Sequence, residues 1–206
     1  NISHCDYMFS NCSNLQSPCR ITFKFFSGRI QSASSFCWSS GISSLPSNLF
    51  SGTIYSLSLN KAFFGCTNLS SISSGAFNYT VSSGTQCVDM FYGCTSLLNV
   101  SGVVIPDIRS AVNMFLNSGL TTITSSLFSD SPNCASYAYC FSGCRNLRTA
   151  GSQGNPITPS NHSVTVDIDG MFENCSNLLT AEYAFGDVTE NKPGPSGTDN
   201  SYIESG

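Results

Sequence analysis

The chain has 206 residues, of which 10% are charged and 40% are apolar, and it carries 11 cysteines and 15 phenylalanines. So little charge excludes a solvated disordered chain, and so many phenylalanines exclude a linker. No stretch approaches the roughly 18 consecutive apolar residues of a membrane-spanning helix. The chain begins without Met and shows no basic segment followed by an apolar one, so we expect a fragment or a processed product without a signal peptide.

The net charge of −4 is unevenly distributed. Residues 1–166 carry seven bases and four acids, whereas residues 167–206 carry one base and eight acids. The bases stand singly and form no stripe that would follow a phosphate backbone, so binding to nucleic acid is not expected. We interpret the acidic end as a solvated terminus.

In chain order, the first recurring element is a motif of about eight residues. It consists of an apolar residue and Phe, two variable residues, Cys or Ser, two small residues, and Leu or Ile. The first copy is Met8-Phe9-Ser10-Asn11-Cys12-Ser13-Asn14-Leu15, and six more copies begin at residues 36, 62, 90, 114, 140 and 171. The copies at 36 and 114 are one residue shorter, with Ser in place of Cys and Gly directly before the apolar residue.

The spacing of the copies predicts the fold class. Successive Phe positions lie 28, 26, 28, 24, 26 and 31 residues apart, as in leucine-rich-type solenoids. We therefore predict a repeat solenoid, leucine-rich-repeat-like, with short parallel strands on one face and irregular, 3₁₀ or short helical returns. Residues 1–186 are predicted to form about seven coils, and residues 187–206 a Pro/Gly-rich tail or linker.

Within each coil, strands of about four residues are predicted to begin at the repeat leucine, as in 69–72, 97–100 and 120–123, because apolar residues alternate there with Ser and Thr. The preceding segments, such as 88–94 and 111–118, are predicted to form a single helical or 3₁₀ turn. Stacked coils would bury the motif's Met, Phe and Leu in one apolar column. The insert 151–163 interrupts the pattern after the sixth copy.

The motif Met-Phe-x-x-Cys-x-x-Leu, followed by a Ser-rich segment ending in Leu-Phe, resembles the BspA-like class of leucine-rich repeats. The resemblance covers about Cys5 to Gly186, and the chain departs from it in its irregular repeat lengths and in the insert. It implies an extracellular or cell-surface module for binding or adhesion, with a protein or cell-surface ligand as its partner. It does not imply any one ligand.

Cysteines concentrate at one repeat position, where Ser substitutes in the two short copies. The predicted structural ladder consists of Cys12, Ser40, Cys66, Cys94, Ser118, Cys144 and Cys175. A position that accepts Ser or Cys favours a small side chain whose weak donor faces the adjacent coil. Cβ atoms about 4.8 Å apart are too distant for the spacing of about 3.8 Å in a disulfide, so we predict free, buried thiols.

The other six cysteines are Cys5, Cys19, Cys37, Cys87, Cys134 and Cys140. We interpret Cys37 and Cys140 as core filler, because they replace apolar residues of the motif. A disulfide between Cys134 and Cys140 is left open. The odd total leaves at least one thiol free unless a second chain supplies a partner.

No metal site, cofactor or catalytic site is expected. The chain has no Cys-x-x-Cys pair, and its two histidines, His4 and His162, lie in a terminus and an insert. Asp167 and Asp169 would share one face of a strand and could both bind calcium. The alternation of polar and apolar residues before a motif copy explains their spacing equally well. Asp167, Asp169 and Glu173 are also not expected to supply the pair of acids of a glycosidase, because the sequence around them lacks the aromatic residues that stack against sugars. We therefore predict a protein that is not an enzyme.

Seven Asn-x-Ser/Thr sequons support glycosylation only in a eukaryote; they lie at Asn1, Asn11, Asn68, Asn78, Asn99, Asn161 and Asn174.

The favoured function is adhesion through an uncharged face rich in Ser, Thr and Asn. The alternative is a structural or receptor-binding component of a phage virion or an extracellular filament. Because Cys5 lies inside a repeat with no polar cap, we expect further repeats or a partner chain to cover the N-terminal end.

Overall fold

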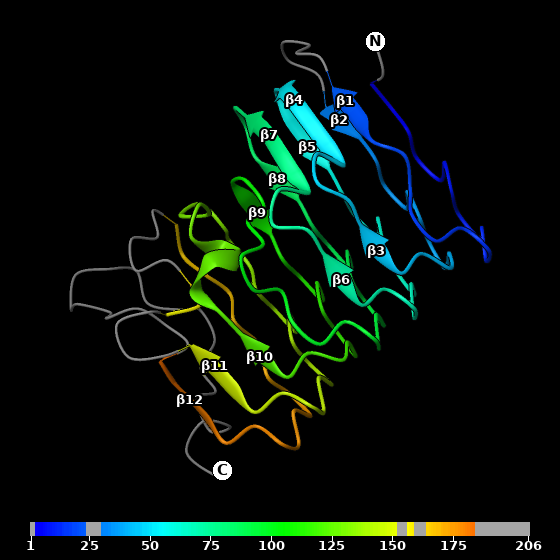
Figure 1. Ribbon diagram of the computed structural model, residues 1–206. Coiled ribbons are helices and arrows are strands. Elements are labelled where there is room, and N and C mark those ends of the chain that lie inside the picture. The colour runs from blue at the N-terminus through cyan, green and yellow to red at the C-terminus, as the bar shows by residue number, and fades with distance from the viewer. Residues whose placement is uncertain (1–2, 24–29, 152–155, 159–163, 184–206) are drawn as a thin grey trace.

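The chain winds as a parallel β-solenoid, in which each coil lies beside the one before it (Figure 1). The computed structural model describes residues 3–23, 30–151, 156–158 and 164–183. The predicted tail 187–206, His162 and most of the insert lie outside the described residues. Within them, the repeat solenoid expected from the spacing of the motif is confirmed.

The strands lie in three rows along the solenoid and form four parallel sheets, because the third row is interrupted between β6 and β10. The first row contains β1 (Ile21–Phe23), β4 (Phe50–Ile54) and β7 (Phe77–Val81). The second contains β2 (Ile30–Ser32), β5 (Ser56–Ser58), β8 (Thr85–Gln86) and β9 (Ile108–Ser110). The third follows the repeat leucine and contains β3 (Ser44–Leu45), β6 (Ser71–Ile72), β10 (Thr122–Ile123), β11 (Thr149–Gly151) and β12 (Thr180–Tyr183).

Two details of the predicted coil are wrong. Strands occupy three rows, not one face, because residues beyond the repeat leucine also alternate between core and solvent, as β7 does. The strands predicted at 69–72 and 120–123 are shorter than expected and begin two residues later, as β6 and β10. No strand forms at 97–100, where the next coil is joined by a hydrogen bond of 2.9 Å from the Thr121 N–H to the Leu98 carbonyl.

The segments predicted as helical or 3₁₀ turns contain instead a run of overlapping tight turns. We call these eight-residue stretches the turn segments; they are residues 5–12, 33–40, 59–66, 87–94, 111–118, 137–144 and 168–175. The third and seventh residues of each have positive φ, such as 55° at Asp89 and 68° at Gly93. A helix cannot continue through such residues. Of the described residues, only η1 (Ser125–Phe128) is 3₁₀-helical.

Backbone hydrogen bonds of 2.7–3.1 Å join each of the first six turn segments to the following coil. The N–H groups of the third, fifth and seventh residues donate to carbonyls of the following segment, and the N–H of the first residue donates to the carbonyl of the residue just before that segment. The bond from Phe63 N–H to the Met90 carbonyl, 2.9 Å long, is one example. The N–H groups of the fourth, sixth and eighth residues bond within their own turns, as from Cys94 to the Phe91 carbonyl at 3.2 Å.

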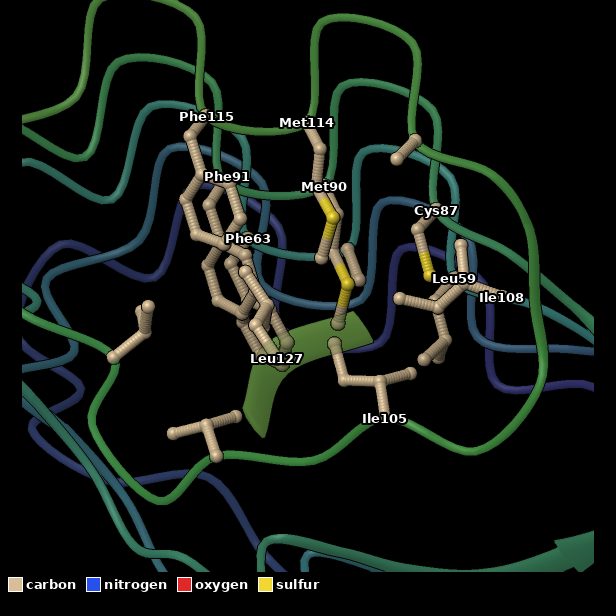
Figure 2. Close-up of a cluster of buried hydrophobic side chains, with 14 of the residues drawn as sticks. Leu59, Phe63, Cys87, Met90, Phe91, Ile105, Ile108, Met114, Phe115 and Leu127 are labelled. Atoms are coloured by element: carbon tan, nitrogen blue, oxygen red, sulfur yellow. The ribbon is translucent and has the colours of Figure 1, made fainter. Parts of the chain in front are cut away.

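The core is a column of stacked side chains that the turn segments point inward (Figure 2). Its centre is a row of parallel Phe rings with centroids 5.2–5.7 Å apart; these are Phe63, Phe91, Phe115, Phe141 and Phe172. Met90 and Met114 stack beside this row and are fully buried. The structure confirms the apolar column expected from the repeat, because each coil buries its motif residues only against its neighbours.

Candidate binding surface

The predicted ladder residues occupy the eighth position of the turn segments. Four thiols donate to the carbonyl of the Phe-position residue in the preceding coil. These are Cys66 to Cys37 (2.9 Å), Cys94 to Phe63 (3.2 Å), Cys144 to Phe115 (3.2 Å) and Cys175 to Phe141 (3.1 Å). The same carbonyl oxygen also accepts a hydrogen bond from the backbone N–H of the ladder residue in its own turn. The thiol therefore donates to the second lone pair of that oxygen.

The two serines of the ladder are buried and contact the next thiol along the column. The Oγ atoms of Ser40 and Ser118 lie 3.6 and 3.3 Å from the Sγ atoms of Cys66 and Cys144. The prediction of a buried thiol is wrong for Cys12, which is exposed; its Sγ lies 3.8 Å from the carbonyl oxygen of Ser10 in its own turn. All eleven cysteines of the chain are free, including Cys134 and Cys140.

Burial raises the pKa of the ladder thiols, because a thiolate would be poorly solvated in the core. The pKa of Cys144 rises to about 11 and that of Cys175 to about 12, in both cases chiefly through desolvation. The pKa values of Cys66 and Cys94 are raised for the same reason. A thiol that stays protonated at neutral pH is a poor nucleophile, so the ladder provides packing and hydrogen bonds, not reactivity.

These shifts predict destabilisation at alkaline pH. A folded pKa above the ordinary value of 9.0 means that the unfolded chain releases protons which the folded chain keeps. The thiols' contribution to stability is therefore complete below about pH 9 and is lost as the pH rises through about 11 and 12. We expect each such thiol to lower the free energy of unfolding by up to about 1.4 kcal/mol per pH unit in this range.

Urea unfolding of the reduced protein at pH 7, 9, 10 and 11 measures this loss. Cys144→Ser should make the dependence on pH less steep, because serine does not ionise and the ladder already accepts it at Ser118. Cys19→Ser, at an exposed thiol, is the control for removing a cysteine outside the ladder. Equal pH dependence in the wild-type and Cys144→Ser proteins would contradict the assignment.

In the described part of the chain, no group of three or more His, Cys, Asp or Glu side chains is arranged to hold a metal ion. The Oδ2 atom of Asp167 accepts from Ser136 Oγ at 3.1 Å, and its Oδ1 accepts from the Asp169 N–H at 3.0 Å. This carboxylate shapes a turn and joins two coils. His4 is exposed at the first coil. Five sequon asparagines are also exposed: Asn11, Asn68, Asn78, Asn99 and Asn174.

Three aromatic side chains form a strip on the outer side of the turn segments, and sequence reasoning did not predict it. We call Trp38, Phe64 and Tyr92 the aromatic strip; each is the sixth residue of its segment. Phe64 stacks on Tyr92 with ring centroids 4.5 Å apart, and Trp38 lies 6.4 Å from Phe64. Trp38 is 36% exposed and the other two are half-buried.

A polar side chain of the next turn segment contacts the end of the strip. The Asn117 Nδ2 donates to Tyr92 Oη at 3.5 Å, which extends the row by one coil. The exposed Tyr7 and Tyr139 are the third residues of the first and sixth segments. In the sequence, each member of the strip directly follows the Phe position of the motif. This position is one of the two variable residues of the motif, so the aromatic residues there were not recognised as a group.

The outer faces of the strand rows carry hydroxyl and amide groups that bond across coils. Thr22 and Thr53 on the first row reach Ser51 and Thr80 of the next coil, both with oxygen separations of 3.2 Å. Asn78 Nδ2 donates to Asn48 Oδ1 at 2.7 Å. These contacts satisfy part of the polar surface internally, so the rows are less available to a ligand than the density of Ser and Thr suggests.

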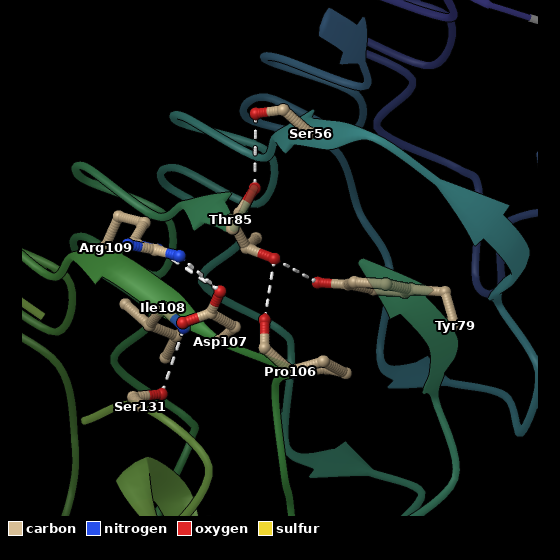
Figure 3. A network of polar contacts seen from close by, with 9 residues as sticks. Ser56, Tyr79, Thr85, Pro106, Asp107, Ile108, Arg109 and Ser131 are labelled. Carbon is tan, nitrogen blue, oxygen red and sulfur yellow. Dashed lines mark hydrogen bonds and ion pairs between the residues drawn. The ribbon is translucent and has the colours of Figure 1, made fainter. Parts of the chain in front are cut away.

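A buried polar network connects the first and second strand rows (Figure 3). Thr85 Oγ1 donates to the Pro106 carbonyl at 2.7 Å and lies 3.0 Å from the Oη of Tyr79, so this phenol donates to it. Burial raises the pKa of Tyr79 well above its ordinary value. Asp107 pairs with Arg109 at 2.8 Å. The bonds among Tyr79, Thr85 and Pro106 stabilise the corner between the two strand rows.

The described residues contain no helix with the length and apolar character needed to span a bilayer. The chain matches no protein-family model, no curated protein and no solved structure. The role of the aromatic strip is therefore inferred from its geometry alone.

Proposed function

We propose that this chain is a non-enzymatic binding module of the BspA-like leucine-rich-repeat type, which mediates protein–protein or cell-surface attachment outside the cell. The motif supports the family, and the aromatic strip carries the proposal of binding. Aromatic side chains that stay accessible at the surface are enriched in protein interfaces, because they bury a large apolar area at low cost in side-chain entropy.

The strip suits a ligand that binds by shape and hydrogen bonds. Trp38 supplies an exposed apolar ring, and its neighbour Phe64 lies against it in a tilted arrangement with ring centroids 6.4 Å apart. The Tyr92 hydroxyl and the Asn117 amide supply polar groups at the other end of the strip. The nearest ion pair on these segments, Lys61 with Asp89 at 3.9 Å, balances its own charge, so electrostatic capture is not expected to dominate.

Binding of the purified protein to extracellular-matrix proteins and to host cells tests the proposal. We expect at least one target to bind at micromolar concentration. Trp38→Ala should weaken that binding by about 10-fold or more, as for a central aromatic residue of an interface. Surface plasmon resonance on immobilised matrix proteins and flow cytometry on cells measure the two cases.

Tyr55→Ala is the matched control, because Tyr55 is also aromatic and 36% exposed but lies between β4 and β5, away from the strip. It should leave the affinity unchanged. Absence of binding to every target at micromolar concentration would refute the adhesive role. Equal losses in Trp38→Ala and Tyr55→Ala would refute the strip as the binding site.

A further inference from the structure

Strand β7 ends the first row of strands in the middle of the solenoid. Figure 1 shows it beside β4, with further coils following along the chain. The next coil is described throughout residues 97–110, yet it contributes no strand to this row. In the described part of the chain, no backbone hydrogen bond joins residues 70–82 to residues 98–106. The edge of β7 that faces away from β4 is therefore not paired by the coil that follows it.

The sequence of the next coil explains the missing strand. Asn78 lies nine residues after the repeat leucine Leu69, and Pro106 lies nine residues after Leu97. The Asn78 N–H faces β4 in the parallel register, but proline has no N–H and cannot make the equivalent bond to β7. This coil also has the shortest repeat, with 24 residues between Phe positions. Its backbone leaves the row after Pro106 and joins the second row at β9.

The backbone groups on the free edge belong to Phe77, Tyr79 and Val81. In a parallel sheet, the N–H and C=O groups of successive residues point alternately to the two sides of a strand. The Ser82 N–H donates to the Ile54 carbonyl of β4's coil at 3.2 Å, so the even-numbered residues bond to β4. The N–H and C=O groups of the three odd-numbered residues point the other way. Within the described residues, none of them has a hydrogen-bond partner.

Partly exposed apolar side chains accompany these backbone groups. Val81 is half-buried, and the following Ser82 and Ser83 are exposed. In the next coil, Val104 and Pro106 are half-buried. Edge strands are commonly protected from pairing by a charged residue or a proline, and β7 contains neither. This edge is thus suited to pairing with another strand.

We propose that the free edge of β7 binds an extended segment of a partner protein, which adds to the row as a further parallel strand. The segment donates N–H groups to the Tyr79 and Val81 carbonyls and accepts from their N–H groups. The exposed Asn78 and Thr80 favour hydroxyl or amide side chains on the outer side of the segment, alternating with apolar ones. Such strand addition obtains its affinity from main-chain bonds and its specificity from alternate side chains.

The lengths of the neighbouring coils favour a single segment as the occupant. In the short coil, Ala111 begins the next turn segment six residues after Ile105. In the coil after it, Tyr137 begins its turn segment nine residues after Phe128. Because only one coil is shortened, the place left in the row suits one added strand better than the whole sheet of a second folded copy. The site is separate from the aromatic strip and does not rest on the proposed function.

A fluorescein-labelled peptide with the sequence of residues 76–82 is the probe, because that segment lies on β4 as the partner would lie on β7. Fluorescence anisotropy should show saturable binding with a Kd below about 1 mM. N-methylation of the peptide at its Thr80 position should weaken binding by about 10-fold or more, because it removes an N–H that bonds to β7. N-methylation at its Tyr79 position is the matched control and should leave the affinity unchanged, because that N–H faces away.

Val81→Pro tests the edge from the side of the protein. It removes an N–H that faces the partner and leaves the bonds to β4 in place, and proline is tolerated on edge strands. The variant should weaken peptide binding by about 10-fold or more. Val81→Thr keeps the N–H and should bind like the wild type. Trp38→Ala should also bind the peptide like the wild type, because Trp38 belongs to the aromatic strip.

Four results would overturn the proposal. These are no saturable binding up to about 1 mM peptide, equal losses with the two methylated peptides, equal affinities of Val81→Pro and Val81→Thr, and a loss of peptide binding in Trp38→Ala. A dimer in sedimentation velocity that Val81→Pro abolishes would also overturn it, because it would assign the edge to a second copy. If circular dichroism showed that Val81→Pro does not fold, the two methylated peptides would still decide between the outcomes.

Discussion

Replacing Gly119 by alanine is expected to lower the free energy of unfolding by about 3 kcal/mol. A Cβ at this residue would overlap the carbonyl oxygen of Thr95 in the preceding coil and would lie 3.3 Å from that of Leu97. The coils cannot separate to make room, because the Gly119 N–H donates to the Cys94 carbonyl at 3.1 Å. Urea unfolding followed by circular dichroism measures the loss.

Gly75→Ala is the matched control for this prediction. Its added Cβ would meet only the Cβ of Ser47, at 4.0 Å, and Gly75 does not have positive φ. The change should alter stability by less than about 1 kcal/mol, and the lower entropy of the unfolded chain favours a gain. If both alanine variants were equally stable, the close approach of the coils at Gly119 would not be a constraint.

This steric contact also explains the two short motif copies. Gly41 in the other short copy has the same relation to the first coil, where its N–H donates to the Cys12 carbonyl at 3.1 Å and an added Cβ would overlap Ser13. The short copies have one residue fewer before the apolar position, and this brings their backbone into contact with the preceding coil. Glycine is the one residue without a Cβ, which accounts for its presence in both copies.

Phe91→Ala is expected to lower the free energy of unfolding by about 3–5 kcal/mol. Phe91 is fully buried, and its ring stacks between Phe63 at 5.3 Å and Phe115 at 5.2 Å. The substitution leaves a cavity in the middle of the column, and the rigid spacing of the coils prevents its collapse. Equilibrium unfolding in urea, with the slope compared between variants, measures the effect.

Phe9→Ala provides the comparison, because Phe9 has the same repeat position but lies in the first coil and is only partly buried. Its ring packs against that of Phe36, with ring centroids 5.2 Å apart. Its loss should cost about 2 kcal/mol or less, since less area leaves water on folding. Equal losses at the two positions would contradict a column that is packed more tightly in its middle than at its end.

Much of the core could be predicted from sequence, because the repeat forces equivalent residues into equivalent environments. Met90, Phe91 and Leu97 were assigned to the interior by their period alone, and all three are fully buried. The Ser and Cys alternation at one position indicated a small side chain with a weak donor, and Cys94 and Ser118 have that position in the stack.

The path of the turn segments could not be predicted in the same way. An adjacent apolar pair such as Met90-Phe91 suits a helical turn as well as a run of tight turns, and only the backbone geometry distinguishes them. The Gly or Asn at the seventh residue, as in Gly93 and Asn117, was the available signal, because these residue types tolerate positive φ. The aromatic strip was missed because its members lie at a place where the motif varies.

The length and low charge of the chain excluded disorder, and the spacing of its repeats by itself determined a solenoid with Met, Phe and Leu inside. These properties follow from each coil's own residues, since burial of an apolar stripe requires only that a similar coil lie beside it. The run of tight turns in the turn segments, the close approach at Gly119 and the stacking of Phe64 on Tyr92 were decided by the tertiary structure alone. They depend on how groups of different coils meet, which no single coil's sequence encodes.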